Sequence, residues 1–340
     1  MDHVAIDLGS QESQVCVRRA DGTIVDERKV PTRKLSKLMA SWAPSRVILE
    51  TCSEAFHLAD AAKALGHDVR VVPATMVRTL GVGARGVKTD RRDAQVLSEV
   101  SCRIELPSVH VPSALARELK SMCGAREALV ETRTKLINNV RGWTRTQLWR
   151  IKKGSTGSFA ARVRGHAVAL ALPLPTHIER QLVVIETVHE QIKAADQQVT
   201  QTATEHTICR LLMTAPGVGP VTAVRFVAAL DDASRFPHAH ALQSYLGLTP
   251  GENSSSERER RTGITKAGPT ELRRTLVQAA WSAYRTRPND PMVAWATQVA
   301  ARRGLFIGVV ALARKLAGIL FAMWRDGSPY RASKAAVLSD

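Results

Sequence analysis

The sequence has few aromatic residues and few cysteines. Its 340 residues include six Trp, three Tyr, six Phe and five Cys. No two cysteines are at C-x-x-C spacing and their number is odd, which argues against a zinc site or a disulfide framework. Scattered free thiols are typical of a reducing compartment, so we expect a cytoplasmic protein. Met1-Asp2-His3 also lacks the basic and then apolar run of a signal peptide.

Long uncharged hydrophobic runs are scarce as well. The most apolar stretch, residues 304–324, has Arg314 and Lys315 at its centre. Each of these would cost about 2.5–3.5 kcal/mol at the centre of a bilayer. We therefore expect a buried helix with a basic edge, and no membrane partner.

Acidic residues are outnumbered by basic ones. Forty-eight Lys and Arg against 31 Asp and Glu give a net charge of +17. The hydrophobic fraction of 44% is too high for a disordered polyelectrolyte. The charge therefore predicts a folded protein with a polyanionic partner, most often nucleic acid, without indicating what is done to that partner.

Strand and helix patterns alternate in the first hundred residues. Hydrophobic strands are expected at 3–7, 46–50 and 68–72, with further strands around Val15 and Ile24 joined through a turn at Asp21-Gly22. Helices are expected at 35–42, 56–65 and 90–101. This alternation predicts an α/β fold with a mixed sheet, and the pattern is mainly helical from residue 112 onward.

Four carboxylates form the most distinctive pattern. Asp7 and Glu50 each end a predicted strand, and Asp90 and Asp93 are three apart, on one face of a helix. Together they could hold Mg²⁺, which prefers oxygen ligands and can activate a phosphodiester. Each acid also has a structural explanation, since Asp90 could cap its helix, Asp93 could pair with an arginine and Glu50 could be a surface acid.

The middle of the chain has a basic segment and a heptad-like stripe. Residues 141–165 hold seven basic residues and no acid, which suits either a solvated loop or a strip that contacts nucleic-acid phosphates. Apolar residues then follow a 3-4 spacing, typical of a short coiled coil or of an amphipathic helix on the core. They are Ile178, Leu182, Ile185, Ile192 and Val199.

The last third contains a glycine turn and a serine triplet. Gly217 and Gly219 precede an apolar helix, where backbone N–H groups could bind a DNA phosphate or simply form a helix–helix connection. After Leu246-Gly-Leu-Thr-Pro250, residues 254–256 are three serines within a basic stretch. They could form a flexible linker or supply a nucleophilic hydroxyl aimed at a phosphodiester.

Together these motifs resemble the DEDD transposases of the insertion sequence 110 and 1111 family, recombinases guided by a structured bridge RNA. The similarity runs from residue 3 to about 330, in family order. The matching motifs are Ala5-Ile-Asp7, Leu49-Glu50-Thr51, Lys88-Thr-Asp90-Arg-Arg-Asp93-Ala94, Pro216-Gly-Val-Gly219, Leu246-Gly-Leu-Thr-Pro250, Ser254-Ser255, Ile264-Thr-Lys-Ala-Gly268 and Leu272-Arg-Arg274.

The resemblance implies three regions. These are a RuvC-like (ribonuclease-H-like) DEDD catalytic domain at residues 1–150, a helical, coiled-coil-like linker at 151–205, and a helical transposase domain with the serine motif at 206–340. The four family acids map onto Asp7, Glu50, Asp90 and Asp93, as catalytic residues and Mg²⁺ ligands. The family serine, five residues after Pro250, maps onto Ser255. Ser256 stands where the family usually has Gly, so Ser254 and Ser256 leave the assignment open by one residue.

The implied activity is Mg²⁺-dependent, RNA-guided DNA recombination that excises and inserts an insertion sequence by serine-mediated strand cleavage and exchange. Its partners would be donor and target DNA, the bridge RNA and further copies of the chain, as a dimer or as a tetramer on DNA. It would work in the bacterial cytoplasm, on the nucleoid. The alternatives are a hydrolytic RuvC-like nuclease or junction resolvase, and a non-catalytic nucleic-acid-binding remnant. The expected nucleic-acid contacts are Lys88, Arg91, Arg92, Arg150, Lys152, Lys153, Gly217, Gly219, Lys266, Arg273 and Arg274.

Overall fold

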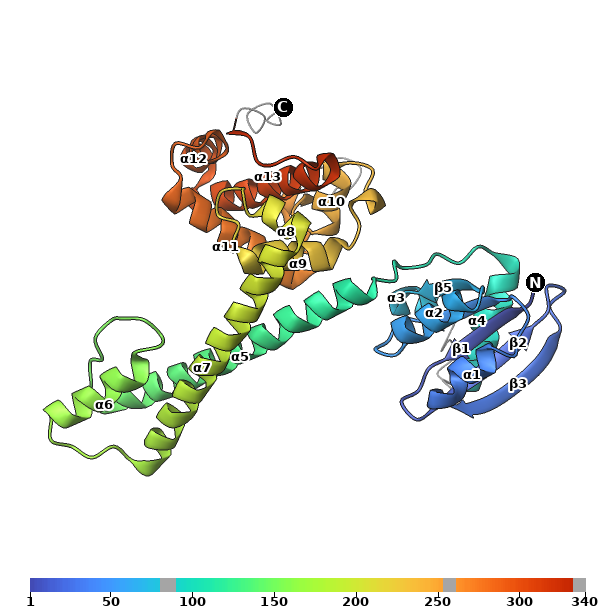
Figure 1. The fold of residues 1–340 in the computed structure, drawn as a ribbon, viewed down its shortest axis with the longest axis horizontal. Coiled ribbons are helices and arrows are strands. Elements are labelled where there is room, and N and C mark those ends of the chain that lie inside the picture. The colour runs from blue at the N-terminus through green and yellow to red at the C-terminus, as the bar shows by residue number, and fades with distance from the viewer. Residues whose placement is uncertain (80–89, 253–260, 333–340) are drawn as a thin grey trace. The chain divides into compact units, whose positions relative to one another are not determined.

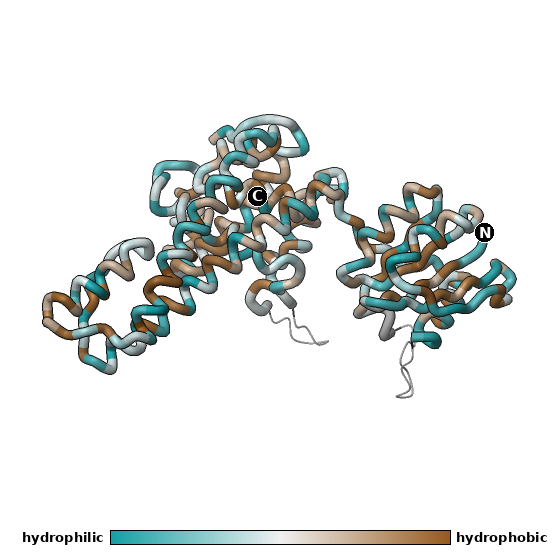
Figure 2. Tube along the Cα trace, turned by 60° about the horizontal axis from the view of Figure 1, so that its bottom comes forward, coloured by the Kyte–Doolittle hydropathy of each residue, from teal (hydrophilic) through white to brown (hydrophobic). Residues whose placement is uncertain are grey.

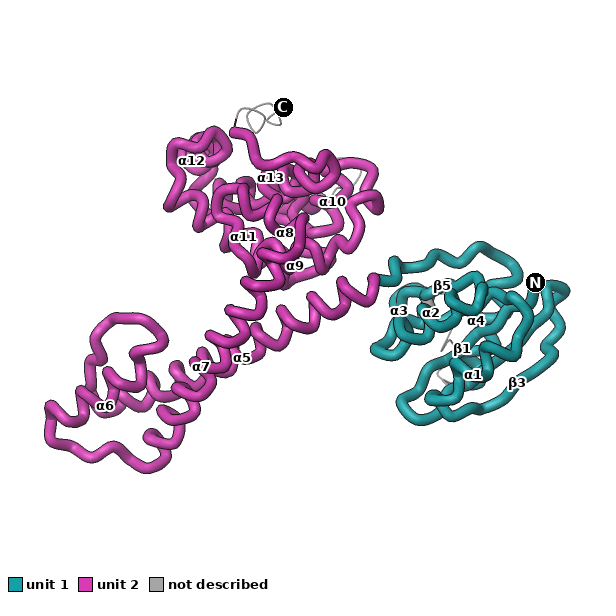
Figure 3. Tube along the Cα trace, viewed as in Figure 1, with its two compact units in different colours: residues 1–112 teal, residues 113–340 magenta. Residues whose placement is uncertain are grey.

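The computed structural model describes residues 1–79, 90–252 and 261–332. Lys88 and the serines at 254–256 lie outside the described residues. The chain divides into two compact units, residues 1–112 and 113–340 (Figure 3). The helix that starts at Ala114 belongs to unit 2, because its apolar residues, such as Leu119 and Cys123, lie in the core of that unit. The domain bounds 1–150, 151–205 and 206–340 stay predictions.

Unit 1 is built on a five-stranded mixed sheet with the strand order β3-β2-β1-β4-β5 (Figure 1). Strands β1, β2 and β3 are antiparallel neighbours, and β4 and β5 run parallel to β1. The strands are β1 His3–Asp7, β2 Glu12–Arg18, β3 Ile24–Pro31, β4 Arg46–Glu50 and β5 Asp68–Val72. The predicted strands are therefore confirmed, as is the turn at Asp21-Gly22, where Gly22 has a φ of 93°.

Each face of this sheet is covered by helices because the strand side chains alternate. Val4 and Ile6 pack with Leu58 of α2, whereas Ala5 and Ile48 pack with Leu97 of α4 on the opposite face. The helices of unit 1 are α1 Leu35–Met39, α2 Ala55–Ala64, α3 Ala74–Thr79 and α4 Asp90–Arg103, preceded by the short 3₁₀ helix η1 Thr32–Lys34. A mixed sheet with helices, followed by a helical region, is consistent with the expected ribonuclease-H-like fold.

Unit 2 begins with two long helices that lie side by side, α5 Ala114–Thr146 and α7 Thr176–Glu205 (Figure 1). The shorter α6, Phe159–Ala169, packs at their far end. All five residues of the heptad-like stripe are buried, and Ile178, Leu182 and Ile185 contact α5 and α6 of the same chain. Figure 2 shows the corresponding alternation of hydropathy along both long helices. The stripe therefore forms a helical hairpin within one chain.

The remainder of unit 2 is a helical bundle around α13. Its elements are α8 Thr207–Leu212, α9 Pro220–Leu230, η3 Ala233–Arg235, α10 Ala239–Tyr245, β6 Pro250–Glu252, β7 Arg261–Ile264, α11 Thr270–Thr286, α12 Pro291–Arg303 and α13 Leu305–Asp326. Among the described residues, α13 is the one helix long and apolar enough to cross a membrane. Because 61% of its apolar window is buried inside the protein and packs in the core, the expectation of a buried helix is confirmed.

Candidate functional site

Asp7 and Glu50 occupy neighbouring positions at one edge of the sheet. They are the last residues of β1 and β4, which run parallel, and the register pairs Ile6 with Leu49 immediately before them. Both residues are half-buried. Carboxyl ends of adjacent parallel strands meet at the same edge, so the structure brings these two predicted acids together.

Both side chains belong to the sheet face that α4 covers. Residues two apart on a strand share a face, and Ala5 and Ile48, each two positions earlier, pack with Leu97 of α4. His3 lies on the same face, where its Nδ1 is 2.7 Å from Ser101 Oγ near the end of α4. Asp7 and Glu50 therefore extend this face toward the other end of α4.

The first turn of α4 reaches the same edge of the sheet. Ser101 lies beside His3, and Ser98 lies beside Cys16, which pairs with Ala5, so α4 runs antiparallel to β1. Asp7 lies roughly 13 Å along the strand from His3. A helix needs about nine residues to cover the same length. Counting back from Ser101 leads to the first turn of α4, where Asp93 lies buried at 3% exposure.

The four acids thus share one edge of unit 1, with Asp93 buried, Asp7 and Glu50 half-buried and Asp90 exposed. Carboxylate oxygens suit a hard divalent cation. In the part of the chain that the structure describes, however, no three His, Cys, Asp or Glu side chains are gathered into a group that could hold a metal ion. The structure therefore places the four carboxylates along one edge of unit 1 without gathering them into a metal site, and the roles of the four residues stay predictions.

Sequence reasoning missed Glu27, which fastens the first turns of α4 to β3. Arg91 Nε donates to Glu27 Oε2 at 2.8 Å, and Gln95 Nε2 donates to Glu27 Oε1 at 2.7 Å. The hydrogen bond from Arg91 is the main reason why the pKa of Glu27 is lowered and that of Arg91 is raised. Arg91 remains 69% exposed and Arg92 is also exposed, as a contact to DNA would require. A single acid on a strand carries no sequence signal for this pairing.

The basic segment of residues 141–165 contains cations in two different environments. Arg150, Lys152 and Lys153 are exposed in the connection between α5 and α6. Arg164 instead donates to Glu179 at 2.8 Å and to Glu186 at 2.6 Å, and these hydrogen bonds raise its pKa. Only part of this segment is therefore available to a polyanion.

The glycine turn before α9 makes a close contact with α11. Gly217 has a φ of 77°, and a Cβ there would be 2.2 Å from Ala279 O. Gly219 caps α9 with room around it, and Pro220 occupies the first turn. The contact explains the need for glycine at 217 as a helix–helix connection, and phosphate binding at this turn stays a prediction.

Two segments flank the serine segment, residues 246–252 before it and 261–268 after it, and we call them the stems; backbone hydrogen bonds and one arginine join them. Thr265 N donates to Thr249 O at 3.0 Å, and Lys266 N donates to Gly247 O at 3.1 Å. Arg273, only 8% exposed, donates through Nη1 to Leu246 O at 3.0 Å and to Ala267 O at 2.6 Å. Arg273, expected from the sequence to contact nucleic acid, thus lies inside the protein and binds both stems, whereas Lys266 is exposed.

A second buried arginine was not identified from the sequence. Arg225 lies in the apolar helix α9 at 6% exposure and donates through Nη2 to Glu127 Oε2 at 2.7 Å. Arg274, half-exposed, donates to the other oxygen of Glu127 at 2.6 Å and also pairs with Glu271. This network joins α5, α9 and α11. A cation in an otherwise apolar helix was the available signal for Arg225.

Comparisons with known proteins find similarity to transposases over nearly the whole chain. A model described as "Transposase IS116/IS110/IS902 family" matches residues 209–292, and a model for IS110 DEDD transposases, described as "Transposase", matches residues 4–145. The chain is 28% identical to a "Probable family 20 transposase" of Pseudomonas aeruginosa, over 97% of this chain and 99% of that protein. It is 26% identical to the "Transposase for insertion sequence element IS1111A" of Coxiella burnetii, over 96% of this chain and 91% of the relative.

A further relative is the "Putative transposase y4qE" of Sinorhizobium fredii. It is 31% identical to the chain, over 78% of this chain and 71% of the relative. Family models thus match both the acid-bearing unit and the helical bundle, and relatives match from end to end. The chain belongs to the IS110 family of DEDD transposases.

Proposed function

We propose that this transposase is a Mg²⁺-dependent DNA recombinase that moves an insertion sequence under the guidance of a bridge RNA. The observation that carries the proposal is the placement of Asp7 and Glu50 at adjacent strand ends, on the sheet face whose helix begins with Asp90 and Asp93. Similarity to transposases over both units supports the same reading.

In this proposal Asp7, Glu50, Asp90 and Asp93 hold the metal ion. A bound Mg²⁺ would polarise the phosphodiester and stabilise the charge that develops on its oxygens. The protein supports the ligands through the sheet and the first turns of α4, which Glu27 fastens to β3. The exposed cations Arg91 and Arg92 flank the acids and would hold the DNA backbone beside them.

Ser255 is the proposed nucleophile in unit 2. Its Oγ would attack the phosphorus, so that an Oγ–P bond forms as a P–O bond of the DNA backbone breaks and the departing oxygen takes up a proton. The phosphoserine ester keeps the bond energy, and a DNA hydroxyl can later reverse the step. Arg273 supports this role because it holds the two stems that lead into the serine segment.

Recognition of sequence would rest on base pairing with the RNA, while the protein binds backbones. The exposed Arg150, Lys152, Lys153 and Lys266 provide cations for that task. As the family resemblance implies, the acids and the serine motif would act together in an assembly of several copies of the chain, a dimer or a tetramer on DNA.

The test is strand cleavage of labelled element DNA with its RNA, followed on a denaturing gel. We expect wild-type protein with Mg²⁺ to form a covalent protein–DNA adduct that Ser255→Ala abolishes, while Ser254→Ala and Ser256→Ala, the matched controls, keep it. Asp7→Asn should lower cleavage about a thousandfold, because loss of a preorganised charge stabiliser costs 10²–10³ or more.

Other outcomes would contradict the proposal in specific ways. Full cleavage by Ser255→Ala without an adduct would identify a hydrolytic nuclease that uses the acids alone. Tight nucleic-acid binding by wild-type protein without Mg²⁺-dependent cleavage would identify a non-catalytic remnant. Activity that persists without added RNA would remove the guided step.

A further inference from the structure

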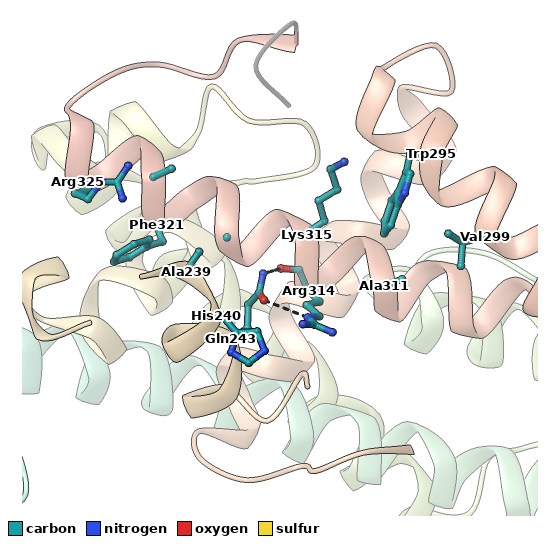
Figure 4. Close-up of a pocket in the computed structure, with 12 residues that line it drawn as sticks. Ala239, His240, Gln243, Trp295, Val299, Ala311, Arg314, Lys315, Phe321 and Arg325 are labelled. Atoms are coloured by element: carbon teal, nitrogen blue, oxygen red, sulfur yellow. Dashed lines mark hydrogen bonds between the residues drawn. The ribbon is translucent and has the colours of Figure 1, made fainter. Parts of the chain in front are cut away.

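A basic groove lies between α10, α12 and α13 of unit 2 (Figure 4). Its volume is about 570 Å³, within the range of small-ligand sites. Arg314, Lys315 and Arg325 line it together with His240 and Trp295, and none of the described lining residues is Asp or Glu. The lining therefore suits an anion that also carries an aromatic or apolar part.

Lys315 is a partly desolvated cation in the wall of this groove. It is 7% exposed, its Nζ lies 4.6 Å from the centre of the Trp295 ring, and burial lowers its pKa. The aromatic face stabilises the cation. Charges interact more strongly where water is displaced, so an anion reaching Lys315 gains more than it would from a lysine on the open surface.

Arg314 is held in place by a reciprocal pair of hydrogen bonds. Its Nε donates to Gln243 Oε1 at 3.1 Å, and Gln243 Nε2 donates back to Arg314 O at 3.0 Å (Figure 4). A Cβ at position 318 would lie 2.9 Å from Gln243 Nε2, so Gly318 gives this side chain its space. The pair orients the guanidinium without using its two Nη groups, which are the atoms that bind a phosphate side by side.

The other side chains contribute unequally. Arg325 forms an ion pair with Asp326 at 2.8 Å, so its charge is partly neutralised. His240 is exposed on α10, on the wall opposite Trp295 of α12. Lys315 thus lies beside Trp295 of α12, and Arg314 lies beside Gln243 of α10.

We propose that this groove binds an unpaired nucleotide within a single nucleic-acid strand. The phosphate contacts Arg314 and Lys315, and the base lies against His240 or the accessible edge of Trp295. A cationic groove with interleaved rings is the usual arrangement for single strands, whereas a rigid duplex presents its phosphates along a convex surface and keeps its bases stacked. The inference rests on the proposed function only in taking nucleic acid as the partner.

Photo-cross-linking of the full-length protein tests this inference. Eight-nucleotide strands carrying 4-thiouridine (RNA) or 4-thiothymidine (DNA) are bound in EDTA, where no cleavage occurs, and cross-linked peptides are mapped by mass spectrometry. We expect cross-links on α10 and α12. Their yield should fall about tenfold in Arg314→Gln and in His240→Ala, because one phosphate contact or one stacked base contributes about that much affinity.

The matched control is Arg302→Gln, which makes the same change at an exposed position of α12 that does not line the groove. Its cross-link yield should stay within about twofold of wild type. Because Arg314 bonds to Gln243, circular dichroism is compared first, and His240→Ala, at an exposed position, gives the answer if Arg314→Gln is unfolded.

Comparing the RNA strand with the DNA strand shows which kind of nucleic acid the groove binds. Cross-linking of RNA alone indicates a guide strand, cross-linking of DNA alone indicates a displaced DNA strand, and each supports the site. The proposal is overturned if cross-links avoid α10 and α12, if a blunt duplex labels them equally well, or if polyglutamate competes as well as an unlabelled strand. Cross-linking is measured in EDTA and needs no cleavage. A failed cleavage assay would therefore contradict the proposed function and not the groove, and failed cross-linking would contradict the groove and not the proposed function.

Discussion

The sequence pattern predicted the positions of Asp7 and Glu50 in unit 1 correctly, but it did not predict the surroundings of Arg273 in unit 2. Asp7 and Glu50 lie where strand ends predict them, side by side on the face that α4 covers. Arg273, expected at a nucleic-acid surface, binds backbone carbonyls inside the protein. A strand dictates the position of its last residue, whereas the partner of a long cation depends on whatever the fold brings within reach.

Because of such internal contacts, the net charge of +17 overstates the number of cations that can bind a polyanion. Several cations are already paired with acids of their own unit, among them Arg225, Arg274 and Arg164. The charge available to a polyanion therefore resides mainly in exposed residues without such a role. Two of the four predictions below separate cations that stabilise the fold from those that bind nucleic acid, and the other two concern the glycine turn of unit 2 and Glu27 of unit 1.

The largest effect is expected for the buried cation of α9. Arg225→Met should lower the free energy of unfolding of unit 2 by about 3 kcal/mol or more, because it leaves part of the charge of Glu127 uncompensated. Urea unfolding followed by Trp fluorescence measures this change. Arg302→Met, an exposed control, should cost less than about 0.5 kcal/mol, and an equal cost for both variants would contradict an internal role for Arg225.

Much of unit 1 could be predicted because its elements are short and periodic. Strands β1, β4 and β5 match the expected ranges residue for residue, and α4 begins at Asp90 as expected. The packing of α5 could not be predicted in the same way, because its periodicity shows an apolar face without showing which core covers that face. Leu119 and Cys123 pack in the core of unit 2.

The site was predictable to the extent that local geometry determines it. The shared edge of the four acids follows from two strand ends and one helix turn. The pairs Glu27–Arg91 and Glu127–Arg225 join residues that are 64 and 98 positions apart, and no local pattern connects such residues. Arg273 was expected outside because a run of arginines near a serine motif does not show which of them the stems will bury.

The second prediction concerns the glycine turn. Gly217→Ala should cost about 2–3 kcal/mol, since a φ of 77° strains an alanine and its Cβ would meet Ala279 O. Gly219→Ala is the matched control, because a Cβ there meets nothing within 4 Å. Both variants keep the backbone N–H groups. Urea unfolding gives the stabilities, and equal losses for the two would contradict the close contact with α11.

The third prediction concerns the exposed cations between α5 and α6. Replacing both Lys152 and Lys153 by Gln should lower the slope of log affinity against log salt by about 1.8, as expected for two lost phosphate contacts. Fluorescence anisotropy with duplex DNA at several salt concentrations measures the slope. Arg164→Gln, in the same segment but paired with Glu179 and Glu186, should lower stability and leave the slope unchanged. The reverse pattern would show that the pairing in the structure does not decide the role.

The smallest effect is expected at Glu27, where the acid and base of one pair both lie beside the candidate site. The pKa of Glu27 is lowered in the folded protein, first by the hydrogen bond from Arg91. A carboxyl group with a lowered pKa stabilises the fold fully above its ordinary value of 4.5, and this contribution is lost as the pH falls through the lowered value. Glu27→Gln should therefore melt about one or two degrees below wild type at pH 7, since Arg91 is largely exposed and the pair is screened by water.

At pH 3 the melting temperatures of wild type and Glu27→Gln should lie closer together than at pH 7, because Glu27 is then protonated in the unfolded protein and the contribution of its lowered pKa shrinks. Glu12→Gln provides the comparison, since the Glu12–Lys29 pair is about half exposed on both sides and should show a smaller difference at pH 7. A deficit in Glu27→Gln that persists undiminished at pH 3 would show that the shape of the hydrogen bonds to Arg91 and Gln95, rather than charge, fastens α4 to β3. In that case the first turn of α4, which carries Asp90 and Asp93, would stay attached to β3 at acid pH. The hydrogen bonds of Glu27 in unit 1 would then stabilise the fold by their geometry, as those of the buried Arg225 and Arg273 do in unit 2.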